Sequence, residues 1–169
     1  LGDTAAATRD GTEVVGALGP IGDSWGMAHA EAMLGGIATA EHRYDDAARA
    51  LARAADESAT MGFLGQAALH RASLARIQQR LGDPAAVASY EEAIRDATSI
   101  GDGRLTATSR LNLARLLRGA GQGTEALDAA VALDVPILLH EGWVGGGFDT
   151  LGIDRATSYA AGHAMSHPF

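Results

Sequence analysis

The sequence contains no cysteine, and its prolines and aromatic residues are few. The absence of cysteine excludes disulfide bonds and every metal site with thiolate ligands. The four prolines stand at positions 20, 84, 136 and 168, so the long spans between them can be helical throughout. Aromatic residues make up only 5% of the chain, whereas alanine, the strongest helix former, supplies much of its 47% hydrophobic content. The composition therefore favours a helical protein with small residues between its helices.

Long apolar runs and an excess of positive charge are also missing. No apolar segment approaches the roughly 20 residues of a membrane span, and no signal-peptide pattern opens the sequence. The formal net charge of −8 argues against broad nucleic-acid binding, because that binding requires a positive face. We therefore expect a cytoplasmic protein whose partners include neither a membrane nor a nucleic acid.

A repeat of about 40 residues organises positions 1–130. Three short segments recur at this spacing: MLGGIA at 33–38, SLARIQ at 73–78 and NLARLL at 112–117. A series of alanines follows the same spacing, and so do the turn segments IGD, MGF and IGD; their positions are 47, 86 and 126 for the alanines and 21–23, 61–63 and 100–102 for the turns. Three markers with one period indicate a repeat array of supersecondary units.

Each repeat unit is predicted to contain two antiparallel helices. Apolar residues fall at helical spacing within the units, and glycine or aspartate marks the turns. A half unit at 1–21 precedes full units at 22–61, 62–100 and 101–130. The predicted helices cover 4–18, 23–41, 44–60, 63–80, 84–99, 103–119 and 122–133. The predicted fold class is all-α, an antiparallel helix-pair solenoid.

These positions resemble the tetratricopeptide-repeat family, whose first helix carries a leucine followed by glycine or alanine and whose second helix carries small residues. The matching residues are Leu34, Gly35, Tyr44, Ala47, Leu51 and Ala54 in the first full unit, Leu74, Ala75, Gly82, Ala86, Tyr90 and Ala93 in the second, and Leu113, Ala114, Gly121 and Ala126 in the third. A period of about 40, rather than about 34, resembles the long-helix variant of large LuxR-type bacterial regulators. The segment GDSWGMAHAEAMLGGIA at 22–38 is similar to that variant.

The resemblance implies a protein–protein interaction scaffold, and we expect the chain to be a fragment of a bacterial regulatory or signalling protein. Such regulators also carry a P-loop and a DNA-binding helix-turn-helix. The sequence has no G-x-x-x-x-G-K-[ST] motif and no basic recognition helix, so neither function is expected of this chain.

Stacked helix pairs bury the apolar faces that one pair cannot bury alone. The predicted core residues are Leu34, Tyr44, Leu51, Leu74, Tyr90 and Leu113. In the tetratricopeptide pattern the first helix of each pair lines a concave groove. The resemblance places His29, Thr39, Arg76, Gln79, Arg115 and Arg118 in a peptide-binding groove, with Gly36, Leu69 and Thr108 beside them.

Arg76 and Arg115 occupy equivalent positions in two repeats, and Arg80 and Arg118 lie close by. A basic strip inside an acidic protein could bind a carboxylate-bearing peptide through forked hydrogen bonds, so the expected partner is a protein or peptide of acidic character. The alternative is that the arginines are solvated or pair with Asp and Glu of the adjacent repeat. Separately, the histidines at 29, 42 and 70 have no partner at metal-ligand spacing.

The repeat register ends near Ala130. VPILL at 135–139 predicts one buried strand, because it is a short apolar run with a β-branched start and a proline at its edge. GWVGGGFD at 142–149 predicts a loop, and 153–164 predicts one short helix. Residues 131–169 are therefore expected to form a non-repeat tail.

The tail resembles a segment of the metal-dependent amidohydrolases related to aminocarboxymuconate-semialdehyde decarboxylase, over ALDVPILLHEG at 132–142 and GIDRATSYAAGHAMSHPF at 152–169. In that family a barrel strand ends in a histidine metal ligand. The resemblance therefore carries the role of ligand to zinc or another divalent metal onto His140 alone. A TIM barrel needs about 250 residues and eight strands, and the family's other ligand motifs are absent from the tail.

Two interpretations of the tail remain. The chain is either a natural or artefactual fusion of the array to a truncated hydrolase segment, or the likeness is accidental and the tail caps the last helix pair. We expect no cofactor and no catalysis by this chain alone. The alternative function is a fragment of a metal-dependent amidohydrolase or decarboxylase that is inactive by itself.

Overall fold

A computed structural model describes residues 4–131, and this part of the chain is helical nearly throughout. The elements are α1 (Thr4–Leu18), the short 3-10 helix η1 (Gly19–Ile21), α2 (Ser24–Ala40), α3 (Tyr44–Thr60), α4 (Leu64–Leu81), α5 (Ala86–Ser99), α6 (Gly103–Gly119) and α7 (Gly123–Val131). No strand occurs among residues 4–131, which confirms the predicted all-α class for them. The predicted strand, loop and short helix of the tail lie outside the described residues.

The helix boundaries follow the sequence prediction closely. α1, α3 and α6 have the predicted limits, and the others differ by one or two residues within the described part. α2 begins at Ser24 because Asp23 caps it, with its carboxylate accepting a hydrogen bond from the Gly26 N–H at 2.9 Å. α5 begins two residues late because Asp83 accepts from the Ala85 N–H at 2.9 Å and holds the segment before the helix in a turn.

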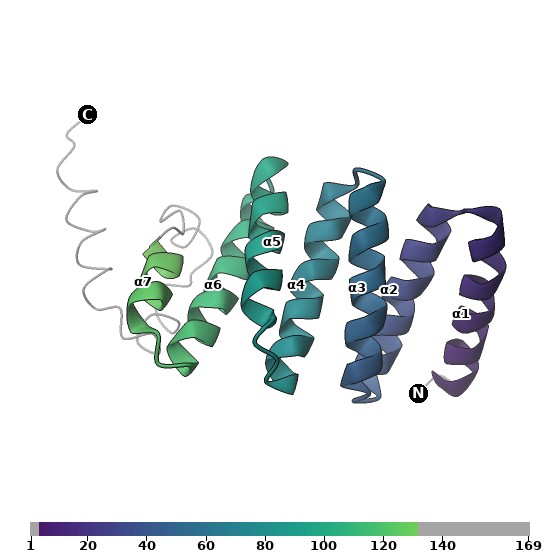
Figure 1. The fold of residues 1–169 in the computed structure, drawn as a ribbon, viewed down its shortest axis with the longest axis horizontal. Coiled ribbons are helices and arrows are strands. Elements are labelled where there is room, and N and C mark those ends of the chain that lie inside the picture. Colours follow the sequence, from purple (N-terminus) through teal and green to yellow (C-terminus); the bar gives the residue numbers. More distant parts are fainter. Residues whose placement is uncertain (1–3, 132–169) are drawn as a thin grey trace. The chain divides into compact units, whose positions relative to one another are not determined.

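The chain forms two compact units, Leu1–Ser109 and Arg110–Phe169, which divide within α6. In the first unit α1 to α5 lie side by side and each helix packs against the next, as Figure 1 shows. Short turns reverse the chain between them. In the second unit the described residues comprise the rest of α6 and α7, joined by the turn around Gly121.

The turns repeat in their backbone geometry as well as in their sequence. Each turn that joins one helix pair to the next contains a left-handed glycine. These glycines are at positions 22, 62 and 101, with φ of 70°, 76° and 73°. The turns within the pairs contain a left-handed residue at 42, 82 and 121, with φ of 60°, 70° and 80°. Glycine occupies five of these positions and His42 the sixth, where a Cβ makes the conformation costly.

Alanine dominates the interfaces between helices. Ala47, Ala54, Ala75 and Ala93 are fully buried, and Ala47 belongs to a cluster that joins α2, α3 and α4. Side chains this small allow helix backbones to approach closely. The interior is therefore built from many close, shallow contacts and few large side chains.

The predicted core is correct in part. Leu51, Tyr90 and Leu113 are buried, with exposed fractions of 6%, 0% and 6%. The other three predicted core residues are only half-buried, which corrects the prediction for Leu34, Tyr44 and Leu74. Tyr44 and Leu74 pack against the edge of the cluster that joins α2, α3 and α4, because Ala38, Ala47, Leu51 and Ile77 fill its centre.

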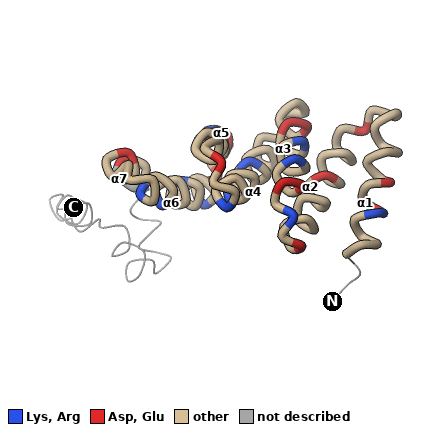
Figure 2. The backbone as a smooth tube through the Cα atoms, turned by 60° about the horizontal axis from the view of Figure 1, so that its bottom comes forward, with Lys and Arg blue, Asp and Glu red and all other residues tan. Residues whose placement is uncertain are grey.

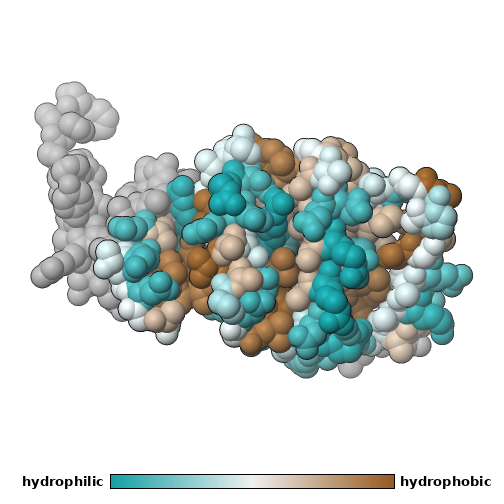
Figure 3. Space-filling model, in the orientation of Figure 1, coloured by the Kyte–Doolittle hydropathy of each residue, from teal (hydrophilic) through white to brown (hydrophobic). Residues whose placement is uncertain are grey.

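The face of α3 that is open to solvent is polar. Hydrophilic residues gather over α3 in Figure 3. None of the helices within residues 4–131 is both long enough and apolar enough to cross a membrane.

Candidate peptide-binding surface

Charge is unevenly distributed among the helices. α4 carries three arginines and α6 carries four, and neither helix contains an aspartate or glutamate. By contrast, α3 has four acidic residues and two arginines, α5 has three and one, and α7 has two and none. Figure 2 shows blue without red along α4 and α6, and red on α3, α5 and α7. In a chain of net charge −8, positive charge is thus concentrated on the first helices of two pairs.

All basic side chains of the chain are arginine, since the sequence contains no lysine. The planar guanidinium group presents a rigid fork of donors that matches a carboxylate with two parallel hydrogen bonds. A lysine would supply only a point charge. The basic helices are therefore suited to bind carboxylates rather than to provide a diffuse positive field.

Arg71 of α4 is used inside the fold. Its Nε lies 3.1 Å from Oε2 of Glu92, and its Nη1 also pairs with Asp96. Its side chain is 17% exposed, and both carboxylates belong to α5. This arginine ties α4 to α5 and is not available to a partner.

Arg76 and Arg80 of α4 are available instead. Arg76 is exposed and its Nη2 donates to Oγ of Ser73 at 3.2 Å, which leaves its charge unneutralised. The guanidinium carbon of Arg80 lies 5.7 Å from the ring centroid of Tyr44, a cation–π contact that keeps the positive charge. Neither arginine makes an ion pair with a described residue. They form one pair of unneutralised cations on the C-terminal half of α4.

An apolar stripe runs along α2 from its first turn to just past its middle. Trp25 and Met33 are 62% and 58% exposed, and both lie four residues from His29 on one face of the helix. The rings of Trp25 and His29 stack with centroids 5.7 Å apart and an angle of 3° between their planes. Large side chains at this spacing usually face a core, but here they face solvent.

The same kind of surface continues on α4. Leu69 is 49% exposed, and the half-buried His70 follows it. Burial lowers the pKa of His70, and the nearby imidazole of His29 lowers this pKa further. The two imidazoles, one on α2 and one on α4, therefore lie close enough to interact electrostatically.

Three residues predicted in the groove lie on this first-unit surface. His29, Arg76 and Gln79 are exposed. Gln79 is partly occupied, because its Oε1 accepts a hydrogen bond from the hydroxyl of the buried Tyr90 at 3.3 Å. Burial raises the pKa of Tyr90, and the charge of Arg76 opposes this rise, so the two side chains lie near each other.

The remaining predicted groove residues differ in their surroundings. Thr39 is half-buried, and its hydroxyl donates to the carbonyl oxygen of Gly35 at 2.7 Å within α2. Arg115 and Arg118 are exposed on α6 in the second unit. That Arg115 shares one groove with Arg76 stays a prediction, because the two residues belong to different units.

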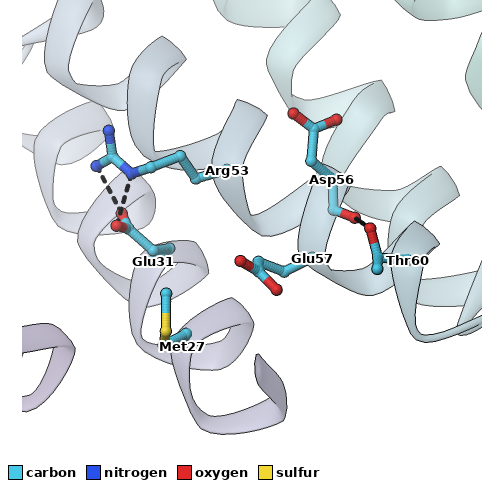
Figure 4. A pocket seen from close by; sticks show the side chains of 6 residues that line it. All are labelled: Met27, Glu31, Arg53, Asp56, Glu57 and Thr60. Atoms are coloured by element: carbon cyan, nitrogen blue, oxygen red, sulfur yellow. Dashed lines mark hydrogen bonds and ion pairs between the residues drawn. The ribbon is translucent and has the colours of Figure 1, made fainter. Parts of the chain in front are cut away.

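A separate hollow of about 240 Å³ lies between α2 and α3. Its residues are Met27, Glu31, Arg53, Asp56, Glu57 and Thr60. Figure 4 shows Glu31 facing Arg53, and the two side chains form a forked pair with N–O distances of 2.6 and 2.8 Å. The side chain of Glu31 is 4% exposed and that of Arg53 is 56% exposed, so this ion pair joins the two helices with its carboxylate buried and its arginine at the surface.

Sequence reasoning placed Arg80 beside Arg76 in the basic strip, but it missed Trp25 and Met33 as surface residues. Both were detectable from helical spacing, because they lie four residues on either side of His29. A four-residue step from this predicted groove residue would have added them to the candidate surface.

The predicted metal site cannot be placed among these residues. His140 lies outside the described part of the chain. Within residues 4–131, no three His, Cys, Asp or Glu side chains form a group that could hold a metal ion.

No model of a protein family matches the sequence, and no curated protein matches it significantly. The function must therefore be argued from the surface itself.

Proposed function

We propose that the chain is a protein-interaction scaffold whose first helices bind an acidic peptide segment. The observation that carries this proposal is the division of charge: α4 and α6 hold seven arginines and no carboxylate. A protein with net charge −8 gains nothing in solubility from gathering its arginines this way. A surface that recognises carboxylates accounts for the arrangement.

The partner class follows from the state of the arginines. Arg76 and Arg80 have no carboxylate partner among the described residues, so a peptide carboxylate would not displace an existing ion pair. An exposed pair of an arginine with a carboxylate contributes up to about 1 kcal/mol, so the two arginines together contribute up to about 2 kcal/mol to binding. Arg115 and Arg118 have the same character on α6, and we extend the proposal to them from the sequence repeat alone.

We further propose that the helix pairs form a tetratricopeptide-like solenoid and that the chain belongs to a bacterial regulatory or signalling protein. The 40-residue period, the recurring left-handed turns and the packing of each helix on the next in the first unit support the solenoid. The regulatory role rests on the resemblance of 22–38 to long-helix regulators. In a solenoid the first helices of successive pairs share one face, which would align the basic helices.

The proposal is tested by selecting partners from a random octapeptide display library on the immobilised protein. We expect the selected peptides to be enriched in aspartate and glutamate relative to the input library. Their affinity for an Arg76→Ala, Arg80→Ala variant should fall at least tenfold, because the loss of about 1.4 kcal/mol or more corresponds to that factor. Fluorescence anisotropy of labelled peptides measures the affinity.

A matched control is available on the second helices. Arg49 and Arg95 have side chains 64% and 65% exposed, and their replacement by alanine changes the net charge by the same amount. The Arg49→Ala, Arg95→Ala variant should bind the selected peptides as the parent does. If both variants bind the selected peptides equally weakly, the loss of affinity comes from the change in overall charge and not from the position of the arginines. A selection without acidic enrichment would overturn the proposal.

A further inference from the structure

The first-unit surface is not uniformly basic along its length. Among its exposed apolar residues, Trp25 belongs to the N-terminal half of α2, Leu69 belongs to the N-terminal half of α4, and Met33 lies just past the middle of α2. Its unneutralised cations, Arg76 and Arg80, belong to the C-terminal half of α4. The surface thus has an apolar region and a basic region in a fixed order along α4.

The apolar region has the properties of a contact site. Trp25 is 62% exposed although its flat ring stacks against His29, so one face of a large ring is ordered and the other is open to solvent. Met33 and Leu69, 58% and 49% exposed, add flexible and aliphatic surface. Tryptophan and methionine are enriched where protein interfaces form, because a rigid ring binds with little loss of entropy and a thioether adapts to its partner.

The spacing between the two regions is set by helix geometry. Arg76 follows Leu69 by seven residues and Arg80 follows it by eleven. At a rise of about 1.5 Å per residue, these arginines lie about 10 and 16 Å further along the axis of α4. An extended peptide advances about 3.3 Å per residue, so the same distances correspond to about three to five peptide positions.

We infer that the partner of this surface is an acidic segment with a large apolar side chain about three to five positions from its carboxylates. The apolar side chain covers Trp25, Met33 and Leu69. The carboxylates bind Arg76 and Arg80. This inference rests on the proposed function and specifies its partner. Charge complementarity selects a peptide with carboxylates, because α4 contains no acidic residue. The only acidic residue of α2, Glu31, is buried and paired with Arg53.

The octapeptide selection tests this inference separately from the proposed function. We expect the selected peptides to share a Trp, Phe, Leu or Met at a fixed distance of three to five positions from an acidic pair. Acidic peptides without a preferred apolar position would overturn the inference and leave the proposed function standing. Peptides without acidic enrichment would overturn both.

Substitutions then separate the two regions. Trp25→Ala should weaken binding of a selected peptide at least tenfold. The same substitution should not change the protein's affinity for a version of that peptide in which serine replaces the apolar residue. The control Val14→Ala removes part of another exposed apolar side chain, 45% exposed on α1, and should have no effect. If Trp25→Ala weakens the two peptides equally, the apolar side chain does not bind at Trp25.

Fluorescence gives a direct readout of the same contact. The chain has two tryptophans, so a Trp143→Phe variant leaves Trp25 as the sole reporter. The selected peptide should shift the emission of Trp25 to shorter wavelength as water leaves the ring, and the serine version should not. An unchanged emission spectrum at saturating peptide would contradict the assigned contact.

Discussion

Two adjacent glycines of α2 provide a sharp test of how closely the helices pack. Gly35 faces α3: a Cβ added there would lie 2.8 Å from Cγ and 3.1 Å from Cδ2 of Leu51. A Cβ added at Gly36 would meet nothing within 4 Å, because this residue is exposed. Gly35→Ala and Gly36→Ala are therefore the same chemical change in the same helix, with and without a neighbour.

The expected free energies follow from these distances. Alanine is more favourable than glycine in a helix by about 0.8–1 kcal/mol, so Gly36→Ala should stabilise the protein by about 0.5–1 kcal/mol. At Gly35 the same gain is opposed by overpacking, which costs about 1–3 kcal/mol when a branched atom must move. Gly35→Ala should therefore be neutral or destabilise by up to about 2 kcal/mol.

Urea unfolding followed by far-UV circular dichroism measures both variants. The midpoints should move in opposite directions or differ clearly, while the dependence of the unfolding free energy on urea stays the same. Equal stabilisation by the two substitutions would refute the close approach of α2 and α3. It would also show that packing accepts alanine as well as glycine after Leu34.

Three further predictions concern single residues. Arg53→Ala should destabilise the protein by about 2–3 kcal/mol in urea unfolding, because it leaves the buried carboxylate of Glu31 unpaired; partial access of water keeps this cost below that of a fully buried pair. The control Arg49→Ala removes an exposed arginine and should cost less than about 1 kcal/mol. Equal losses in the two variants would contradict this reasoning. Because burial lowers the pKa of His70, the imidazole of the unfolded chain is protonated at a higher pH than that of the folded chain, and stability should fall as the pH drops below about 6.5. Urea midpoints measured from about pH 7.5 to 5.5 should show this fall, and His70→Gln should reduce it. His42→Gly should raise the free energy of unfolding by up to about 1 kcal/mol, because φ is 60° at this position, and a lower urea midpoint would show that the side chain stabilises the turn.

Much of the fold was predictable because its signals are local. Glycine and aspartate mark the turns, proline is confined to proposed boundaries, and the period of 40 identifies equivalent helices. These signals placed the ends of α1, α3 and α6 at the observed residues. They could not predict η1, since a single 3-10 turn at Gly19–Ile21 depends on how α1 meets α2.

Burial was harder to predict than helix position. Leu34 and Leu74 recur at the family's anchor position, yet both are half-buried, whereas Leu51 and Ile77 are buried beside alanines in the cluster that joins α2, α3 and α4. Which leucine lies at the centre of a contact depends on the distance between helices, and periodicity alone does not give that distance. Tyr90 was predicted correctly because its neighbours in α5 are alanines at helical spacing.

The candidate surface shows the same limit. Periodicity identified the exposed positions of His29 and Arg76, but not that the hydroxyl of Thr39 binds its own helix backbone or that Gln79 accepts from Tyr90. Such hydrogen bonds depend on rotamers and on the neighbouring helix. The division of charge between helices follows directly from the sequence once the helix boundaries are known, so it could have been predicted before the structure.

The most direct test of the proposed function is the location of the partner on the labelled protein. Nuclear magnetic resonance titration of the full chain with a selected acidic peptide reports which backbone amides change their environment. The account predicts shifts at the exposed residues of α2 and α4, with Trp25, Leu69, Arg76 and Arg80 among the largest, and none at the exposed residues of α3 and α5. Shifts confined to α3 and α5 would contradict it, since the partner would then bind the acidic helices.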